Sequence, residues 1–165
     1  MKTDLSPIDP DLFRSVMRRL ASSVTVITTA HGDGIHGMTA TAVCSVCAVP
    51  PTILIVVNRS ARSHPLIDSS RTFVVNILAE DQQEIAKRFA GKLEDQFVGV
   101  GYHVGGTSGP ILHGAAAHLE CKVASQSDVG THTVFVGEVV GGDVAEAFPL
   151  VYHDGRYPAF SDRNL

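Results

Sequence analysis

The residues whose types best suit contact with a ligand lie in one stretch, from His36 to Asn58. Its first half holds small hydroxyl and methyl side chains, with Thr39, Thr41 and Ser45 among them. Small side chains leave backbone amides uncovered, so this stretch could hold a flat ligand that carries carbonyls and a phosphate. A buried hairpin with no ligand would have the same composition, and spacing alone does not separate the two interpretations.

A second group of ligand-type residues follows directly. Arg59, Ser60 and Ser63 precede a short helix that the pattern predicts from Pro65 to Ser69. Hydroxyl donors, a guanidinium and the N–H groups of a helix start together suit a phosphate. An ordinary capped loop would use the same residue types, so this reading also stays open.

One histidine differs from the other seven, which are scattered and mostly fall on expected turns. His132 begins a predicted strand beside Gly130, and the alternation of that strand places Val134, Val136 and Val140 toward the core. His132 would share their face at the open end of a barrel. An imidazole there could orient or protonate a small ligand.

Cys44 and Cys47 spell C-x-x-C, but they lie within a predicted strand and not at a helix start. Residues three apart on a regular strand face opposite sides with Cα atoms about 10 Å apart, which is beyond disulfide reach. No second cysteine pair or H-x3-H completes a zinc site. We therefore expect no metal site, and we expect Cys44, Cys47 and Cys121 to be buried structural thiols in a reducing compartment.

Composition narrows the class of protein. A chain of 165 residues with 44% hydrophobic residues predicts one domain over 1–165, and a net charge of −4 without a dense basic run gives no reason to expect nucleic acid. No segment has the roughly 20 apolar residues of a membrane span, and the start lacks a signal-peptide pattern, so we expect a cytoplasmic protein without a membrane partner. Phosphate-loop, Rossmann, G-x-S-x-G and H-E-x-x-H motifs are all absent.

Hydrophobic periodicity predicts the elements that position these residues. Helices are expected over 10–21, capped by Asp9 or Ser6, and over 80–89, with Ile85, Ala86 and Phe89 inward and Gly91 as C-cap. About seven strands are expected, over 24–29, two within 36–58 joined at Pro50-Pro51, and then 72–78, 115–124, 132–140 and a hairpin over 149–157.

The order of these elements predicts the architecture. The first three strands are expected to be antiparallel and sequential, and the chain lacks the β-α-β alternation of a parallel sheet. Segment 93–109 shows no regular pattern and is a candidate lid. We predict a mainly β fold, an antiparallel barrel with peripheral helices.

Seven motifs occur in an order that resembles the short-chain flavin reductases, the reductase partners of two-component aromatic monooxygenases such as 4-hydroxyphenylacetate and chlorophenol hydroxylases. They are Leu-Phe-Arg at 12–14, His-Gly-Met-Thr-Ala-Thr-Ala at 36–42, Ser-Val-x-x-x-Pro-Pro ending at 51, Asn-Arg-Ser at 58–60, Arg-Thr-Phe-Val-Val-Asn at 71–76, Phe-Ala-Gly-Lys at 89–92 and Gly-Thr-His-Thr-Val-Phe-Val-Gly-Glu-Val at 130–139.

The resemblance implies a homodimeric FMN-binding split barrel of Greek-key type, which moves a hydride from NADH or NADPH to FAD or FMN and releases reduced flavin to a separate flavin-dependent monooxygenase. The positions that match the family's flavin contacts are Met38, Thr39, Ala40, Thr41, Cys44 and Ser45 at the ring and ribityl chain, Asn58, Arg59, Ser60 and Ser63 at ribityl or phosphate oxygens, and Phe89, Ala90, Gly91 and Lys92 beside the flavin tail. His132 matches the catalytic histidine on the nicotinamide side, although Thr131 stands where many members have aspartate.

In such an enzyme the two cofactors carry the hydride chemistry, so the protein needs only to stack the rings and stabilise negative charge near flavin N1. Backbone N–H groups over 39–45 are the expected source of that stabilisation. Two alternatives fit the same barrel. One is a reductase with tightly held FMN that acts on a cobalamin or ferric complex, and the other is a flavin- or haem-binding module without turnover.

Overall fold

The computed structural model describes residues 6–159. Its elements, in chain order, are α1 (Pro10–Met17), β1 (Ser22–Ser23), β2 (Thr25–His31), β3 (Gly34–Ala40), β4 (Val43–Ala48), β5 (Pro51–Asn58), α2 (Ser63–Ser70), β6 (Thr72–Ile77), α3 (Gln83–Ala90), β7 (Tyr102–Val104), β8 (Pro110–Leu112), β9 (Ala117–Val129), β10 (His132–Val144) and β11 (Val151–Tyr152). None of these helices has the length and apolar character that crossing a bilayer needs.

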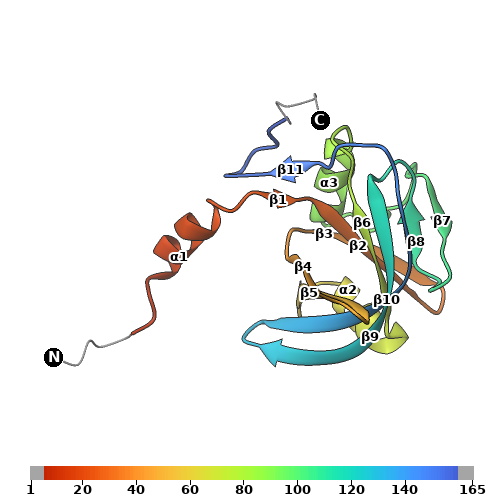
Figure 1. Ribbon diagram of the computed structural model, residues 1–165, viewed down its shortest axis with the longest axis horizontal. Coiled ribbons are helices and arrows are strands. Elements are labelled where there is room, and N and C mark those ends of the chain that lie inside the picture. Colours follow the sequence, from red (N-terminus) through yellow and green to blue (C-terminus); the bar gives the residue numbers. More distant parts are fainter. Residues whose placement is uncertain (1–5, 160–165) are drawn as a thin grey trace.

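Seven strands form one antiparallel sheet in the order β3-β2-β6-β9-β10-β5-β4 (Figure 1). Strands β3 and β4 are its two edges, yet only Thr41 and Ala42 connect them. The chain spans at most about 11 Å over that connection, so the sheet must curl until its edges meet at this corner. The result is a barrel that is closed at one corner and split elsewhere, with α2 and α3 packed against β2 and β3.

This arrangement confirms the expected mainly β fold with an antiparallel barrel and few helices. The expectation that the first three strands are sequential neighbours is wrong, because β3 and β4 lie at opposite edges of the sheet. Antiparallel pairing of β2 with β3 and of β4 with β5 is local, whereas the curl that separates the two pairs depends on the strands between them.

The core consists of two clusters of buried apolar side chains. The larger one fills the barrel, and Phe73 and Phe135 are among its largest fully buried members. The smaller one lies beneath α3 and contains Ala86 and Phe89, as the helical periodicity predicted, with Ile85 partly buried against it. Phe89 therefore fixes α3 to the sheet next to β3.

Strand β10 faces the opposite way from the prediction. Its buried positions are Thr133, Phe135 and Gly137, whereas Val134 and Val136 are half-buried and share a face with His132. Phe135 has more apolar area to remove from water than any valine, and the Thr133 hydroxyl has polar partners, so the odd positions take the core. His132 therefore lies on the outer face of the barrel sheet at the end of β10.

The cysteine predictions need two corrections. Cys44 and Cys47 are exposed and only Cys121 is buried. A β-bulge between Ser45 and Cys47 also breaks the alternation of β4, because Cys44 pairs with Leu54 and Cys47 pairs with Thr52. Since Leu54 and Thr52 are two apart on β5, the two thiols face the same side and not opposite sides.

Other boundaries shift by a few residues. Helix α1 begins after the expected cap Asp9, whose carboxylate accepts from the N–H groups of Asp11 and Leu12, but it ends at Met17 and not Ala21. The segment 93–109 is not wholly irregular, because it contains β7, which pairs with β8. The final hairpin is reduced to β11, which pairs with β1, and to one bridge between His153 and Arg156.

Candidate functional site

A cleft of about 520 Å³ opens where edge strand β3, the turn after β5 and the end of α3 meet. This size falls within the range of small-molecule sites. Its lining residues are His36, Gly37, Met38, Thr39, Asn58, Ser60, Ala61, Arg62, Phe89, Ala90, Gly91, Lys92, Glu94 and Gln96.

The floor of the cleft depends on close contact between β3 and α3. A Cβ on Gly37 would lie 2.6 Å from two ring atoms of Phe89, so only glycine lets the ring reach the strand. The Thr39 hydroxyl donates to the Ala86 carbonyl at 2.6 Å. These contacts hold β3 and α3, which carry Met38 and Phe89 of the apolar wall, in a fixed relation.

The free edge of β3 offers backbone donors. Gly37 N–H donates to Gln96 Oε1 at 3.3 Å and so points away from β2. Because N–H groups of an antiparallel strand alternate in direction, the Thr39 N–H points to the same free edge. Gln96 is only 2% exposed, and its side-chain amide stands at this edge of the cleft. Both groups are donors that a ligand can use.

His36 stands at the wall of the cleft with one nitrogen occupied. Its Nδ1 and the buried Ser63 hydroxyl form a hydrogen bond of 2.6 Å, while Nε2 is buried without a partner in the described chain. Burial, and then the neighbouring Arg62 guanidinium, lower the pKa of His36 below its ordinary value. The imidazole is therefore neutral near pH 7.

The turn after β5 carries the polar side of the cleft. Asn58 Oδ1 accepts from the Ser60 N–H at 2.9 Å and from the Ser60 hydroxyl at 2.8 Å, which closes the turn. Arg62 donates to the carbonyl of Leu93, and Lys92, the residue before Leu93, also lines the cleft. Two cations at one cleft suit a phosphate group.

Of the fifteen residues predicted from the sequence, the cleft brings together Met38, Thr39, Asn58, Ser60, Phe89, Ala90, Gly91 and Lys92. Seven lie outside its lining. Ala40 ends β3, Thr41 borders a separate groove beside α1, and Cys44 and Ser45 are exposed on β4.

The remaining three lie close to the cleft without lining it. Arg59 turns its guanidinium to Gly130, Ser63 lies behind His36, and His132 pairs with Asn58 in the ladder of β10 and β5. The Thr131 hydroxyl is 2.9 Å from Nδ1 of His132.

Sequence reasoning missed His36, Gly37, Ala61, Arg62, Glu94 and Gln96. The first two stand inside the motif at 36–42, and Arg62 lies within the turn already considered, so their neighbours gave a usable signal. Glu94 and Gln96 fall in a segment without periodicity, and contacts distant in sequence, such as the packing of Phe97 against Phe89, hold that segment at the cleft.

The residues present fit a flavin. Backbone and amide donors stand at the free edge of β3, apolar side chains cover the floor, and cations stand on the rim. The unpartnered Nε2 of His36 adds a buried polar atom that lacks a hydrogen bond in the chain alone. In residues 6–159, no group of three or more His, Cys, Asp or Glu is arranged to hold a metal ion.

Comparison with known proteins gives the context for this cleft. The chain is 40% identical over 156 residues to the reductase component of 4-nitrophenol 4-monooxygenase/4-nitrocatechol 2-monooxygenase from Rhodococcus opacus, covering 94% of this chain and 84% of that one. It is 37% identical over 161 residues to the FMN reductase (NADH) RutF of Stutzerimonas stutzeri, covering 94% and 91%.

A solved structure agrees over nearly its whole length. The NADH:FAD oxidoreductase SgcE6 of Streptomyces globisporus, solved in complex with NAD and FAD fragments, superposes with a TM-score of 0.89 at 34% identity, covering 96% of this chain and 99% of that one. Residues 17–161 match the family described as the flavin reductase like domain. The chain therefore belongs to the flavin reductase-like domain family.

Proposed function

We propose that the chain is an NAD(P)H:flavin oxidoreductase, which transfers a hydride from NADH or NADPH to FAD or FMN and supplies the reduced flavin to a separate flavin-dependent monooxygenase. The observation that carries the proposal is the cleft itself, where uncovered backbone donors, an apolar floor and two rim cations meet in a chain of this family. Relatives named as monooxygenase reductase components support the choice of partner.

The chain's own residues would act mainly by positioning. A flavin, when bound, supplies the hydride-accepting chemistry. The Thr39 N–H and the Gln96 amide would stabilise negative charge at a ring edge, since both are fixed before any charge develops. Asn58, Ser60, Arg62 and Lys92 would hold ribityl or phosphate oxygens.

His132 remains the proposed residue on the nicotinamide side. Its support is its place opposite Asn58, a residue of the cleft lining. His132→Ala should lower NAD(P)H oxidation at least about tenfold, or ~1.4 kcal/mol, with little change in flavin affinity. Unchanged turnover would remove His132 from the site.

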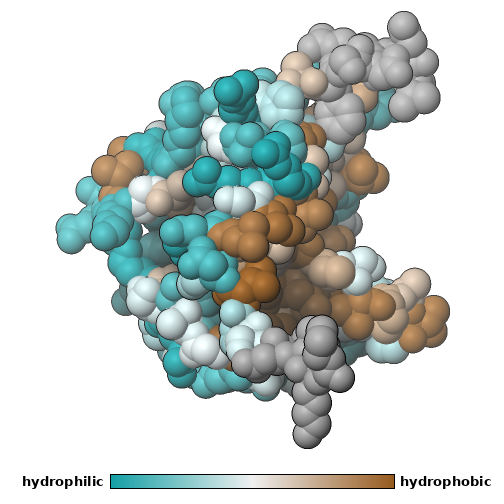
Figure 2. Space-filling model, turned by 90° about the vertical axis from the view of Figure 1, so that its left-hand side faces the viewer, coloured by the Kyte–Doolittle hydropathy of each residue, from teal (hydrophilic) through white to brown (hydrophobic). Residues whose placement is uncertain are grey.

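A homodimer forms part of the proposal. Helix α1 has no buried residue, and Leu12, Phe13 and Val16 are each more than half exposed. Figure 2 shows hydrophobic side chains gathered on the side of the molecule from which α1 projects in Figure 1. An eight-residue helix is marginal in water without a packing partner, and a second copy would supply one. Three free cysteines also fit the proposed cytoplasmic location.

Steady-state oxidation of NADH and of NADPH, with FAD, FMN and riboflavin varied in turn, tests the activity. Saturation in added flavin is expected for a reductase that releases its product. Turnover that does not depend on added flavin would favour a holoenzyme with another acceptor. Flavin binding with constant NADH absorbance would favour a module without turnover.

A further inference from the structure

The turn that lines the cleft is held from outside by the turn between β9 and β10. Arg59 N–H donates to the Thr131 carbonyl at 3.0 Å, and its Nη2 donates to the Gly130 carbonyl at 2.6 Å. Its Nη1 lies 3.6 Å from Asp128 Oδ2. The guanidinium is thus directed to the β9–β10 turn, at the first position after Asn58.

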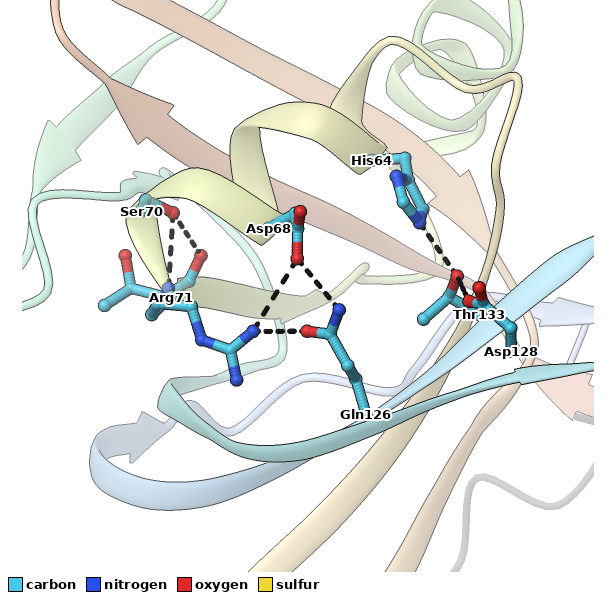
Figure 3. Close-up of polar contacts among 8 residues, drawn as sticks. His64, Asp68, Ser70, Arg71, Gln126, Asp128 and Thr133 are labelled. Carbon is cyan, nitrogen blue, oxygen red and sulfur yellow. Dashed lines mark hydrogen bonds and ion pairs between the residues drawn. The ribbon is translucent and has the colours of Figure 1, made fainter.

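The first turn of α2, which follows this turn in the chain, is linked to Asp128 by a second route (Figure 3). The buried Thr133 hydroxyl donates to Asp128 Oδ1 at 2.6 Å, and His64 Nε2 lies 2.8 Å from that hydroxyl oxygen. The Thr133 hydroxyl has one proton, and it donates that proton in its hydrogen bond to the Asp128 carboxylate. Its oxygen can therefore only accept from His64, which must donate through Nε2–H. In a nucleophile–base pair the hydroxyl would donate to the histidine, whereas here the histidine donates to the hydroxyl. The three groups therefore stabilise the chain and do not activate Thr133 as a nucleophile.

A second set of polar contacts between α2 and the β9–β10 hairpin lies at the C-terminal end of α2. Asp68 Oδ1 accepts from Gln126 Nε2 at 2.9 Å and lies 3.7 Å from Arg71 Nη1, and Arg71 also donates to Gln126 Oε1 (Figure 3). It joins the same helix to the same hairpin, and it likewise includes one aspartate and one arginine. It does not touch the segment 58–62, so it offers a matched control.

We propose that Asp128 and Thr133 are positioning residues for the cleft wall at 58–62. Asp128 is linked to both sides of the segment, by one oxygen to Arg59 within it and by the other, through Thr133, to His64 in the first turn of α2 that follows it. Neither Asp128 nor Thr133 lines the cleft. The segment holds Asn58, Ser60 and Arg62, so the inference rests on the proposed function, in which these residues bind flavin oxygens.

The test uses Asp128→Ala and Thr133→Val, with Asp68→Ala as matched control and Thr133→Ser as conservative rescue. Flavin dissociation constants come from fluorescence titration of the full chain, and KM for flavin and kcat come from NADH oxidation. We expect Asp128→Ala and Thr133→Val to raise the dissociation constant and KM about fivefold to tenfold with kcat within about twofold. Asp68→Ala and Thr133→Ser should stay within about twofold of wild type.

Equal weakening by Asp68→Ala would overturn the inference, because any loosening of α2 would then suffice. An additional variant, Asn58→Ala, separates this inference from the function on which it rests. If Asn58→Ala weakens flavin binding while Asp128→Ala and Thr133→Val do not, the positioning role is wrong and the proposed function stands. If Asn58→Ala also has no effect, the flavin site is misplaced and the inference fails with it.

Discussion

The hydrogen-bond partners of His36 indicate which ring nitrogen of the neutral imidazole carries the proton. A neutral imidazole has one donor and one acceptor, and the Ser63 hydroxyl has no partner other than Nδ1 in the described chain. The hydroxyl proton therefore goes to Nδ1, and the ring proton resides on Nε2, which is buried and unpaired. Protonating the ring would reverse this bond, because Nδ1–H would then donate to the Ser63 oxygen, so the lowered pKa of His36 comes from burial and then from Arg62.

The free energy of unfolding should depend on pH in a way that reflects the lowered pKa of His36. Since the pKa of His36 is lowered on folding from 6.5, the unfolded chain binds the proton more tightly. The stability that the neutral ring contributes is present above pH 6.5 and is lost as the pH falls below it. Urea unfolding from pH 7.5 to 5 should show a smaller loss of stability in His36→Gln than in wild type. An identical pH slope in the two proteins would contradict this.

The thiols should differ sharply in reactivity. Burial, and then Glu120, raise the pKa of Cys121 to about 12, so its thiolate is scarce at pH 8. The double variant Cys44→Ser/Cys47→Ser should therefore give no fast reaction with Ellman's reagent until urea unfolds it. Wild type, in which both other thiols are exposed, is the positive control. A fast native reaction of the double variant would show that Cys121 is accessible.

At the scale of elements, the cleft depends on how closely β3 and α3 approach each other. Gly37 lies against the Phe89 ring, and Thr39 is tied to the Ala86 carbonyl. Phe89 in turn contacts Phe97, with ring centroids 5.1 Å apart, and this contact brings the segment with Gln96 over the cleft. One strand and one helix therefore set the position of a third, irregular segment.

Gly37→Ala tests this dependence. The added Cβ would meet the Phe89 ring at 2.6 Å, so the ring must move, and we expect a destabilisation of about 1–3 kcal/mol. Flavin affinity should fall as well, because Phe89 lines the cleft. Gly34→Ala is the matched control on the same strand, where the nearest atom is the His31 carbonyl oxygen at 3.4 Å. Urea unfolding that shows equal stability for the two variants would contradict the packing argument.

At the scale of the whole molecule, the exposed apolar side chains of helix α1 indicate an interface with another molecule. Its N-terminal cap is formed, so the helix is well defined, yet its apolar side chains contact water. Such a surface is costly for a monomer and ordinary for an interface. The proposed homodimer accounts for it without any change in the barrel.

Acidic substitutions on the apolar face of α1 should therefore dissociate the proposed homodimer. Phe13→Glu combined with Val16→Glu should convert a dimer into a monomer in sedimentation velocity at micromolar concentration, because burying unpaired carboxylates opposes association. Ser15→Gln, on the polar side of the same helix, should leave the dimer intact. A monomeric wild type, or a double variant that still dimerises, would contradict the proposal.

The sequence by itself determined the elements and the composition of the site region. Alternating β-branched runs predicted an antiparallel barrel, Asp9 predicted the start of α1, and the ordered motifs predicted the family. Eight of the fifteen site residues that the resemblance implied meet in one cleft, because they stand at or just after the ends of β3, β5 and α3.

Only the tertiary structure decided which face of β10 is buried, that Cys44 and Cys47 share a side, and that Gln96 reaches the cleft. Each depends on contacts distant in sequence: Phe135 competing with valines for the core, a bulge set by pairing of β4 with β5, and the aromatic contact that draws in a segment without periodicity. Local propensity does not encode such choices, since the energy that settles them comes from packing between elements.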